Sequence, residues 1–111
     1  MKHKVYLSGP MTGRPDFKEH FDAIAAELES KGHVVLNPAA LPKGLAYGEY
    51  FPICIQMLEA ADTILMLPGW GRSKGACMEH QYARTVGKDI EYYTAEAARE
   101  KPTADIRSMN R

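Results

Sequence analysis

The chain has 111 residues, of which 45% are apolar and 25% are charged, and its formal net charge is zero. These values are typical of one globular domain, and the lack of a basic excess argues against binding to a nucleic-acid polymer. No apolar run reaches the about 18 residues of a transmembrane helix, and Val5–Leu7 is too short for a signal-peptide core. We therefore expect a cytoplasmic protein with no membrane partner.

The first half of the chain predicts a strand, a helix and a second strand. Residues 5–7 form a short apolar run that ends at Ser8-Gly9-Pro10 and is predicted to be the first strand. Asp16, with Glu19 three residues later, is typical of a helix N-cap with a capping-box partner. Apolar residues then recur at helical spacing, namely Phe17, Phe21, Ile24 and Leu28. Residues 33–36 are predicted to be the second strand.

The second half continues the alternation. Residues 39–48 are predicted to be the longest loop, and a helix is expected over 50–61 with Ile53, Met57 and Ala60 on its core face. A strand over 63–67 precedes a helix over about 74–86, whose core face is expected to be Met78, Tyr82 and Val86. A fourth strand is predicted at 90–93 and a short helix at 95–101. Residues 102–111 are expected to form a flexible tail.

Strands and helices thus alternate through a single predicted domain over residues 1–111. This order implies a flavodoxin-like, three-layer α/β/α fold around a small parallel sheet of about four strands. A chain of this length buries a limited core, so we expect a homo-oligomer, a dimer or larger. Cys54 and Cys77 both fall in apolar helical patterns and are expected to be reduced thiols, which favours a cytosolic location.

Two Gly-rich stretches follow the first and third predicted strands. Residues 9–14 lack the Gly-Lys-Ser/Thr of a P-loop, and residues 69–75 miss the dinucleotide fingerprint by one position. Backbone N–H groups in either stretch can hold a phosphate, but tight turns also need glycine. Spacing alone slightly favours the turns. Ser73, at the predicted helix start, is equally consistent with an N-cap and with a phosphate contact.

Glu79 lies about one turn inside the predicted third helix, beside the expected core face. Its pattern favours a surface carboxylate over a nucleophile by about two to one. Tyr6 follows strand alternation and is more often a core residue than a catalytic one, although its phenol can orient a carboxylate. Asp62 either caps the preceding helix or takes part in catalysis. Arg14 and Arg72 are loop cations that can pair with an anionic ligand.

The remaining reactive side chains favour neither a metal enzyme nor a serine hydrolase. The histidines and cysteines do not form the two ligand pairs that a zinc site needs. Cys77-Met78-Glu79-His80 has the Cys-x-x-His spacing, but no second pair accompanies it. Gly71-Arg72-Ser73-Lys74-Gly75 has the Gly-x-Ser-x-Gly spacing, but a predicted loop over residues 68–72 separates Ser73 from the preceding strand, whereas the nucleophile of a serine hydrolase lies in the sharp turn directly after its strand. We therefore expect no metal and no cofactor.

Two segments resemble the signatures of the nucleoside 2-deoxyribosyltransferase superfamily. Tyr6–Pro10 resembles its opening strand and loop. The stretch from Asp62 to Gly87-Lys88, with Gly75-x-x-x-Glu79 opening a helix, resembles its second signature. The resemblance covers roughly residues 4–93, and the short chain looks like the DUF4406 branch. It implies that Glu79 attacks the anomeric carbon of a nucleoside and that Tyr6 lies near it, with Asp62 a candidate for the acid that protonates the base.

One departure from the family narrows the expectation. Transferases of the superfamily usually carry Asp six residues before the nucleophile, where this chain has Ser73. This resembles the deoxynucleoside 5′-monophosphate N-glycosidases, in which a Ser helps to hold the phosphate. The resemblance thus implies a glycosidase or transferase acting on a nucleoside or nucleotide, with neighbouring subunits completing the pocket and the C-terminus a candidate for the missing wall. Its substrate-binding candidates are Ser8, Gly9, Pro10, Gly13, Arg14, Ser73 and Gly75. The alternatives are a non-catalytic nucleotide-binding module and a protein that kept only the fold.

Overall fold

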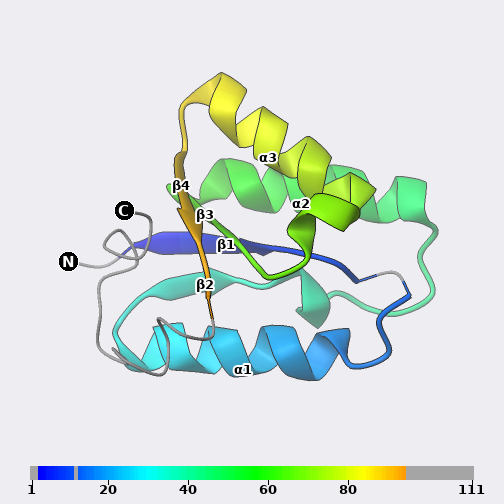
Figure 1. The fold of residues 1–111 in the computed structure, drawn as a ribbon, viewed down its shortest axis with the longest axis horizontal. Helices are drawn as coiled ribbons and strands as arrows, with labels where there is room; N and C mark the ends of the chain where they lie inside the picture. Colours follow the sequence, from blue (N-terminus) through cyan, green and yellow to red (C-terminus); the bar gives the residue numbers. More distant parts are fainter. Residues whose placement is uncertain (1–2, 12, 95–111) are drawn as a thin grey trace.

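Four parallel strands form one sheet within residues 3–11 and 13–94, the part of the chain that the computed structural model describes. The strand order is β2-β1-β3-β4 (Figure 1). The strands are β1 (Lys4–Ser8), β2 (Val34–Leu36), β3 (Thr63–Met66) and β4 (Asp89–Tyr92). The predicted helix at 95–101 and the predicted tail at 102–111 lie outside the described residues.

Three helices cover the two faces of this sheet. α1 (Phe17–Ser30) lies alone on one face, whereas α2 (Tyr47–Ala60) and α3 (Lys74–Val86) share the other (Figure 1). Short 3-10 helices, η1 (Pro38–Ala40) and η2 (Trp70–Arg72), precede α2 and α3. The predicted three-layer, flavodoxin-like architecture is thus confirmed.

Strand alternation explains how both faces become apolar. Val5 and Leu7 of β1 pack toward α1, whereas Tyr6 between them packs toward α2 and α3. β3 is buried along its whole length, as expected for a strand covered on both faces. The sheet therefore separates two cores, and Tyr6 belongs to the core beside α3.

The chain direction places a crevice at one end of the sheet. From β1 the chain passes through α1 to β2 on one side, and then through α2 to β3 on the other side. β1 and β3 thus lie at the point where the strand order reverses. Ligands of open α/β sheets bind outside the carboxyl ends of such strands. The loops that follow Ser8 and Met66 open at this end.

The predicted core face of α1 is confirmed, whereas that of α2 is correct only at Met57, which packs against the core. Phe21, Ile24 and Leu28 of α1 are buried, as expected. In α2, Cys54 and Leu58 are buried, whereas Ile53 is 39% exposed. Apolar side chains surround most of this helix, so their spacing does not select one stripe.

Two details at the helix starts also differ from expectation. Asp16 occupies the N-cap position of α1, but its carboxylate makes no capping bond and instead accepts a 3.0 Å bond from Arg14 Nε. The nearby guanidinium offers a charge-assisted bond that the backbone N–H groups cannot match. α2 starts at Tyr47, inside the predicted loop, which places Pro52 in the interior of the helix. Among the described residues, no helix has both the length and the apolar character needed to span a bilayer.

Candidate active site

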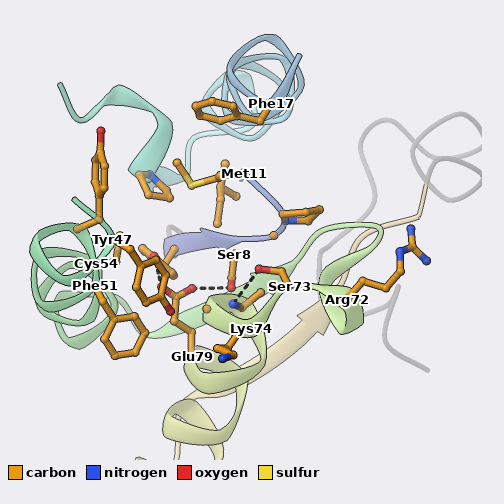
Figure 2. Close-up of a pocket in the computed structure, with 18 of the residues that line it drawn as sticks. Ser8, Met11, Phe17, Tyr47, Phe51, Cys54, Arg72, Ser73, Lys74 and Glu79 are labelled. Atoms are coloured by element: carbon orange, nitrogen blue, oxygen red, sulfur yellow. Dashed lines mark hydrogen bonds between the residues drawn. The ribbon is translucent and has the colours of Figure 1, made fainter. Parts of the chain in front are cut away.

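A cleft of about 740 Å³ opens at the carboxyl ends of β1 and β3, where the topology predicts a ligand site. Residues 6–11 form its floor, and the first turns of α2 and α3 form its walls (Figure 2). Tyr47 and Phe51 of α2 contribute aromatic rings, and residues 72–76 line the opposite rim. A mostly apolar cleft with a few converging polar groups is the usual form of a small-molecule site.

Glu79 points into the cleft and is only 6% exposed, although the sequence pattern favours a surface carboxylate. Its Oε1 accepts a 2.7 Å hydrogen bond from Ser8 Oγ, and its Oε2 accepts a 2.9 Å bond from Tyr6 Oη (Figure 2). Both donors come from β1. The carboxylate is therefore fixed between a helix and the central strand by two hydroxyl groups.

Small residues on α3 allow this close approach. Ala76, Glu79 and Ala83 form the buried stripe of the helix, at positions three and four residues apart. Met78 and Val86, which were expected on the core face, are each 45% exposed, whereas Tyr82, also expected there, packs against the core. The prediction placed the larger apolar side chains on the core face. The buried face instead carries alanines, because their small side chains let the helix backbone lie near the sheet.

The pKa of Glu79 is raised, although a helix N-terminus favours ionised carboxylates. Burial of the carboxyl group raises the pKa, while the bonds from Ser8 and Tyr6 lower it without fully offsetting burial. Glu79 is the sixth residue of α3, and the helix dipole acts mainly within the first turn. The hydroxyl donors, rather than the helix, favour the charged form here.

Tyr6 remains a hydrogen-bond donor over the whole physiological range. Burial raises its pKa well above the ordinary value, and the charge on Glu79 and the neighbouring Cys54 raise it further. Burial also raises the pKa of the Cys54 thiol, which lines the same cleft. Both cysteines of the chain are free thiols, as expected.

The rim beside α3 carries Ser73, which acts as the predicted N-cap. Its Oγ accepts a 3.2 Å bond from the Ala76 N–H, and the hydroxyl proton remains available to a ligand. Arg72 and Lys74 flank Ser73 with exposed cationic side chains and also line the cleft. A helix start between two cations is suited to an anionic group.

Two of the glycines predicted to bind substrate, Gly9 and Gly75, lie where another part of the chain comes too close for a larger side chain. A Cβ at Gly9 would lie 2.9 Å from the Cβ of Leu67, so glycine lets the loop after β1 pack on the end of β3. A Cβ at Gly75 would lie 3.2 Å from Tyr47 Oη across the cleft. Pro10, like these two glycines, lines the cleft.

Three predicted site residues lie outside the cleft. Arg14 pairs with Asp16, and the residues that line the cleft include neither Arg14 nor Gly13. Asp62 precedes β3 at the opposite end of the sheet, beside the amino ends of the strands, where it accepts bonds from Lys4 N and Thr63 Oγ1. Asp62 is therefore not placed to protonate a leaving base in this cleft.

Several lining residues were not singled out from the sequence. On one side they come from the loop after β1 and the start of α1, and on the other from α2 and the loop before it. They are Met11, Phe17, Lys43, Tyr47, Tyr50, Phe51 and Cys54. The sequence does contain one signal, because Tyr47, Tyr50 and Phe51 crowd three aromatic rings into five residues just after a Gly-containing loop.

Solved structures with this architecture include two 2-deoxyribosyltransferases. The enzyme from the psychrotolerant bacterium Bacillus psychrosaccharolyticus aligns with a TM-score of 0.71 at 15% identity, over 96% of this chain and 95% of the other. That from Leishmania mexicana aligns with a TM-score of 0.67 at 21% identity, over 97% of this chain and 77% of the other. At such identities the likeness establishes the fold.

A comparison with curated proteins finds no match. A family model, described as a domain of unknown function (DUF4406), matches residues 3–92. This stretch contains the whole sheet, the three helices and every residue that lines the cleft. The chain therefore belongs to the DUF4406 family.

Proposed function

We propose that this protein cleaves the N-glycosidic bond of a nucleoside 5′-monophosphate, with Glu79 as the nucleophile. One observation carries the proposal: the Glu79 carboxylate is buried at the cleft floor with a separate hydroxyl donor on each oxygen. Two donors hold the carboxylate in one orientation, as an attacking group requires. The 2-deoxyribosyltransferase fold of the structural neighbours supports a deoxyribose sugar.

The proposed reaction proceeds in two displacements at the anomeric carbon. A Glu79 oxygen attacks C1′ while the bond to the base nitrogen breaks, and the bonding electrons leave with the base, which takes a proton from solvent water. The transition state resembles an oxocarbenium ion, and the carboxylate stabilises its positive charge. The resulting ester is then attacked at C1′ by water, which gives hydrolysis, or by a second base, which gives transfer.

The phosphate end of the substrate is assigned to the rim at Ser73. The Ser73 hydroxyl and the first N–H groups of α3 lie at this rim, and the neighbouring residues Arg72 and Lys74, which also line the cleft, add positive charge. This arrangement replaces the expected role of Arg14, which pairs with Asp16. The apolar wall of Tyr47 and Phe51 leaves the other side for the base.

The first test measures base release from a panel of ribo- and deoxyribonucleoside 5′-monophosphates by chromatography. We expect release by the native protein and a loss of about 10⁴-fold or more in Glu79→Gln, since the nucleophile is removed. Asp62→Asn is a matched control, because it changes a carboxylate at the opposite end of the strands from the cleft. Adding a second free base then separates transfer from hydrolysis.

Trapping the intermediate gives an independent readout. Intact mass spectrometry after rapid acid quench should show one sugar phosphate added to the native protein and none added to Glu79→Gln. Equal base release by the native protein and Glu79→Gln would eliminate the mechanism. Tight nucleotide binding without release, retained in Glu79→Gln, would identify the non-catalytic binding module instead.

A further inference from the structure

A contact cluster outside the cleft connects the Ser73 rim to the body of the domain. The Trp70 indole stacks on the His80 imidazole with ring centroids 4.4 Å apart and an interplanar angle of 25°. His80 Nε2 lies 2.9 Å from Tyr92 Oη, so η2, α3 and β4 meet through three side chains. None of these three side chains lines the cleft.

Cys77 adds a second connection between the same elements. Its Sγ lies 3.7 Å from the carbonyl oxygen of Trp70 and 3.5 Å from that of Gly71. Cys77 and His80 are three residues apart on α3, so they lie on one side of the helix and both reach the η2 segment. Both residues of the Cys-x-x-His segment noted in the sequence therefore contact Trp70, Cys77 through the Trp70 carbonyl oxygen and His80 through the indole ring.

The cluster acts on the rim through the backbone of Trp70. The carbonyl oxygen of Trp70 accepts a 3.0 Å bond from the Ser73 N–H, so the position of Trp70 fixes where α3 begins. The segment before Ser73 contains Gly69, with φ of 87°, and Gly71. A stretch rich in glycine has little conformational preference of its own, so a side-chain anchor is needed to hold Ser73 in place.

We propose that Trp70, Cys77 and His80 form a brace that positions Ser73 to bind the substrate phosphate. This inference rests on the proposed function, because it assigns positioning residues to the phosphate end of the same cleft. The brace residues do not touch the substrate. Loosening them should weaken recognition of the phosphate while leaving attack by Glu79 on a bound sugar intact.

Kinetics with two substrates test the brace. Trp70→Leu removes the stacked ring and should raise KM for the 5′-monophosphate about tenfold, the size expected for loss of a charged hydrogen bond. kcat should be retained, and kcat/KM for the matching nucleoside, which lacks the phosphate, should change by less than about twofold. Trp70→Phe restores an aromatic ring and should recover most of the loss.

Tyr92→Phe provides a gentler variant if Trp70→Leu fails to fold. It removes a single oxygen from the His80 contact and should raise KM for the 5′-monophosphate about threefold. Tyr93→Phe is the matched control, because the neighbouring phenol bonds Glu27 on the α1 side of the sheet. Equal losses for nucleotide and nucleoside, or no change in the phosphate preference, would overturn the brace.

A binding readout separates failure of the brace from failure of the proposed function. Trp70 is the single tryptophan of the chain, so its fluorescence reports on this cluster alone. Inorganic phosphate should change the emission of the native protein, and Tyr92→Phe should shift this titration to higher phosphate. If no nucleotide releases its base, this titration still tests the brace. An unchanged emission at saturating phosphate would overturn it.

Discussion

Ser8 Oγ donates a 2.7 Å hydrogen bond to Glu79 Oε1, joining residues 71 positions apart in the chain. Ser8 and Tyr6 are two residues apart on β1, so both side chains point to the same face of the sheet and reach the same carboxylate. The strand thereby supplies both donors, and the helix supplies the acid. The orientation of Glu79 is therefore set mainly by β1, whose two donors also oppose the effect of burial on its pKa.

Removing the Ser8 hydroxyl should move the pH dependence of the reaction. A donor to the charged form lowers a carboxyl pKa, so Ser8→Ala should raise the pKa of Glu79 above its already raised native value. The attacking form of Glu79 is the anion, so the acidic limb of kcat/KM should shift to higher pH.

The measurement is kcat/KM for one nucleotide across a pH series. Tyr6→Phe should shift the limb in the same direction, because it removes the donor to the other oxygen. Ser73→Ala should weaken nucleotide binding without moving the limb, since Ser73 bonds the backbone of Ala76 rather than Glu79. A limb at the same pH in the native protein and Ser8→Ala would contradict this account.

Glu79→Gln should change how stability depends on pH. The native pKa of Glu79 is raised, so the folded state binds its proton more tightly than the unfolded state does. The native protein should therefore lose stability as the pH rises from the ordinary value of about 4.3 through the raised value. Glu79→Gln lacks this loss and should be the more stable protein at neutral pH.

Urea midpoints measured from pH 4 to pH 8, in steps of about one unit, provide the comparison. Asp62→Asn is a control of opposite sign. Burial acts to raise the pKa of Asp62, but bonds from Lys4 and Thr63 lower it on balance, so this carboxylate favours folding as the pH rises. Parallel stability curves for the native protein and Glu79→Gln would refute the prediction.

The fold was predictable because strong local signals agree with one another. The apolar runs around Tyr6 and Ile64 and the order of the elements specify a parallel sheet. Helix faces were less predictable where apolar residues are not confined to one stripe, as in α2, or where the buried residues are small, as in α3. The expected homo-oligomer remains a prediction.

The site was only partly predictable for a physical reason. Ser8, Tyr6 and Glu79 were selected from motifs, but burial of Glu79 depends on the alanines around it, which carry no chemical signal. The pairing of Arg14 with Asp16, which keeps Arg14 away from the cleft lining, was not predicted because Asp16 was assigned to a helix cap. Tyr47 enters the cleft through the packing of α2 against α3, which no spacing within one element reveals.

Gly9→Ala should destabilise the fold, because its Cβ would lie 2.9 Å from the Cβ of Leu67. That atom is attached directly to the backbone, so relief requires a shift of β3 or of the loop. We expect a loss of about 1–3 kcal/mol in the free energy of unfolding, the usual range for overpacking.

Urea denaturation checks this loss against a glycine with free space. A Cβ at Gly48 meets nothing within 4 Å, and Gly48 lies in the first turn of α2. Gly48→Ala should therefore stabilise by about 0.5–1 kcal/mol, because alanine favours the helix. Similar changes in the two variants would show that contact with Leu67 is not limiting.

Lys88→Met should destabilise the protein by removing a side-chain cap from α2. Lys88 Nζ donates to the carbonyl oxygens of Glu59 (2.9 Å) and Ala61 (2.7 Å), at the end of the helix. These carbonyls have no partner within the helix, and a cation also interacts favourably with this end of its dipole. Gly87, with φ of 81°, ends α3 and turns Lys88 toward α2.

We expect Lys88→Met to lower the free energy of unfolding, measured by urea denaturation, by about 1–3 kcal/mol, since both hydrogen bonds are charge-assisted. Lys18→Met is the matched control: Lys18 pairs with Asp22 in an exposed i,i+4 contact, and this substitution should cost about 0.5 kcal/mol or less. Equal losses in the two lysine variants would mean that Lys88 acts as an ordinary surface charge and that the end of α2 is held by packing alone.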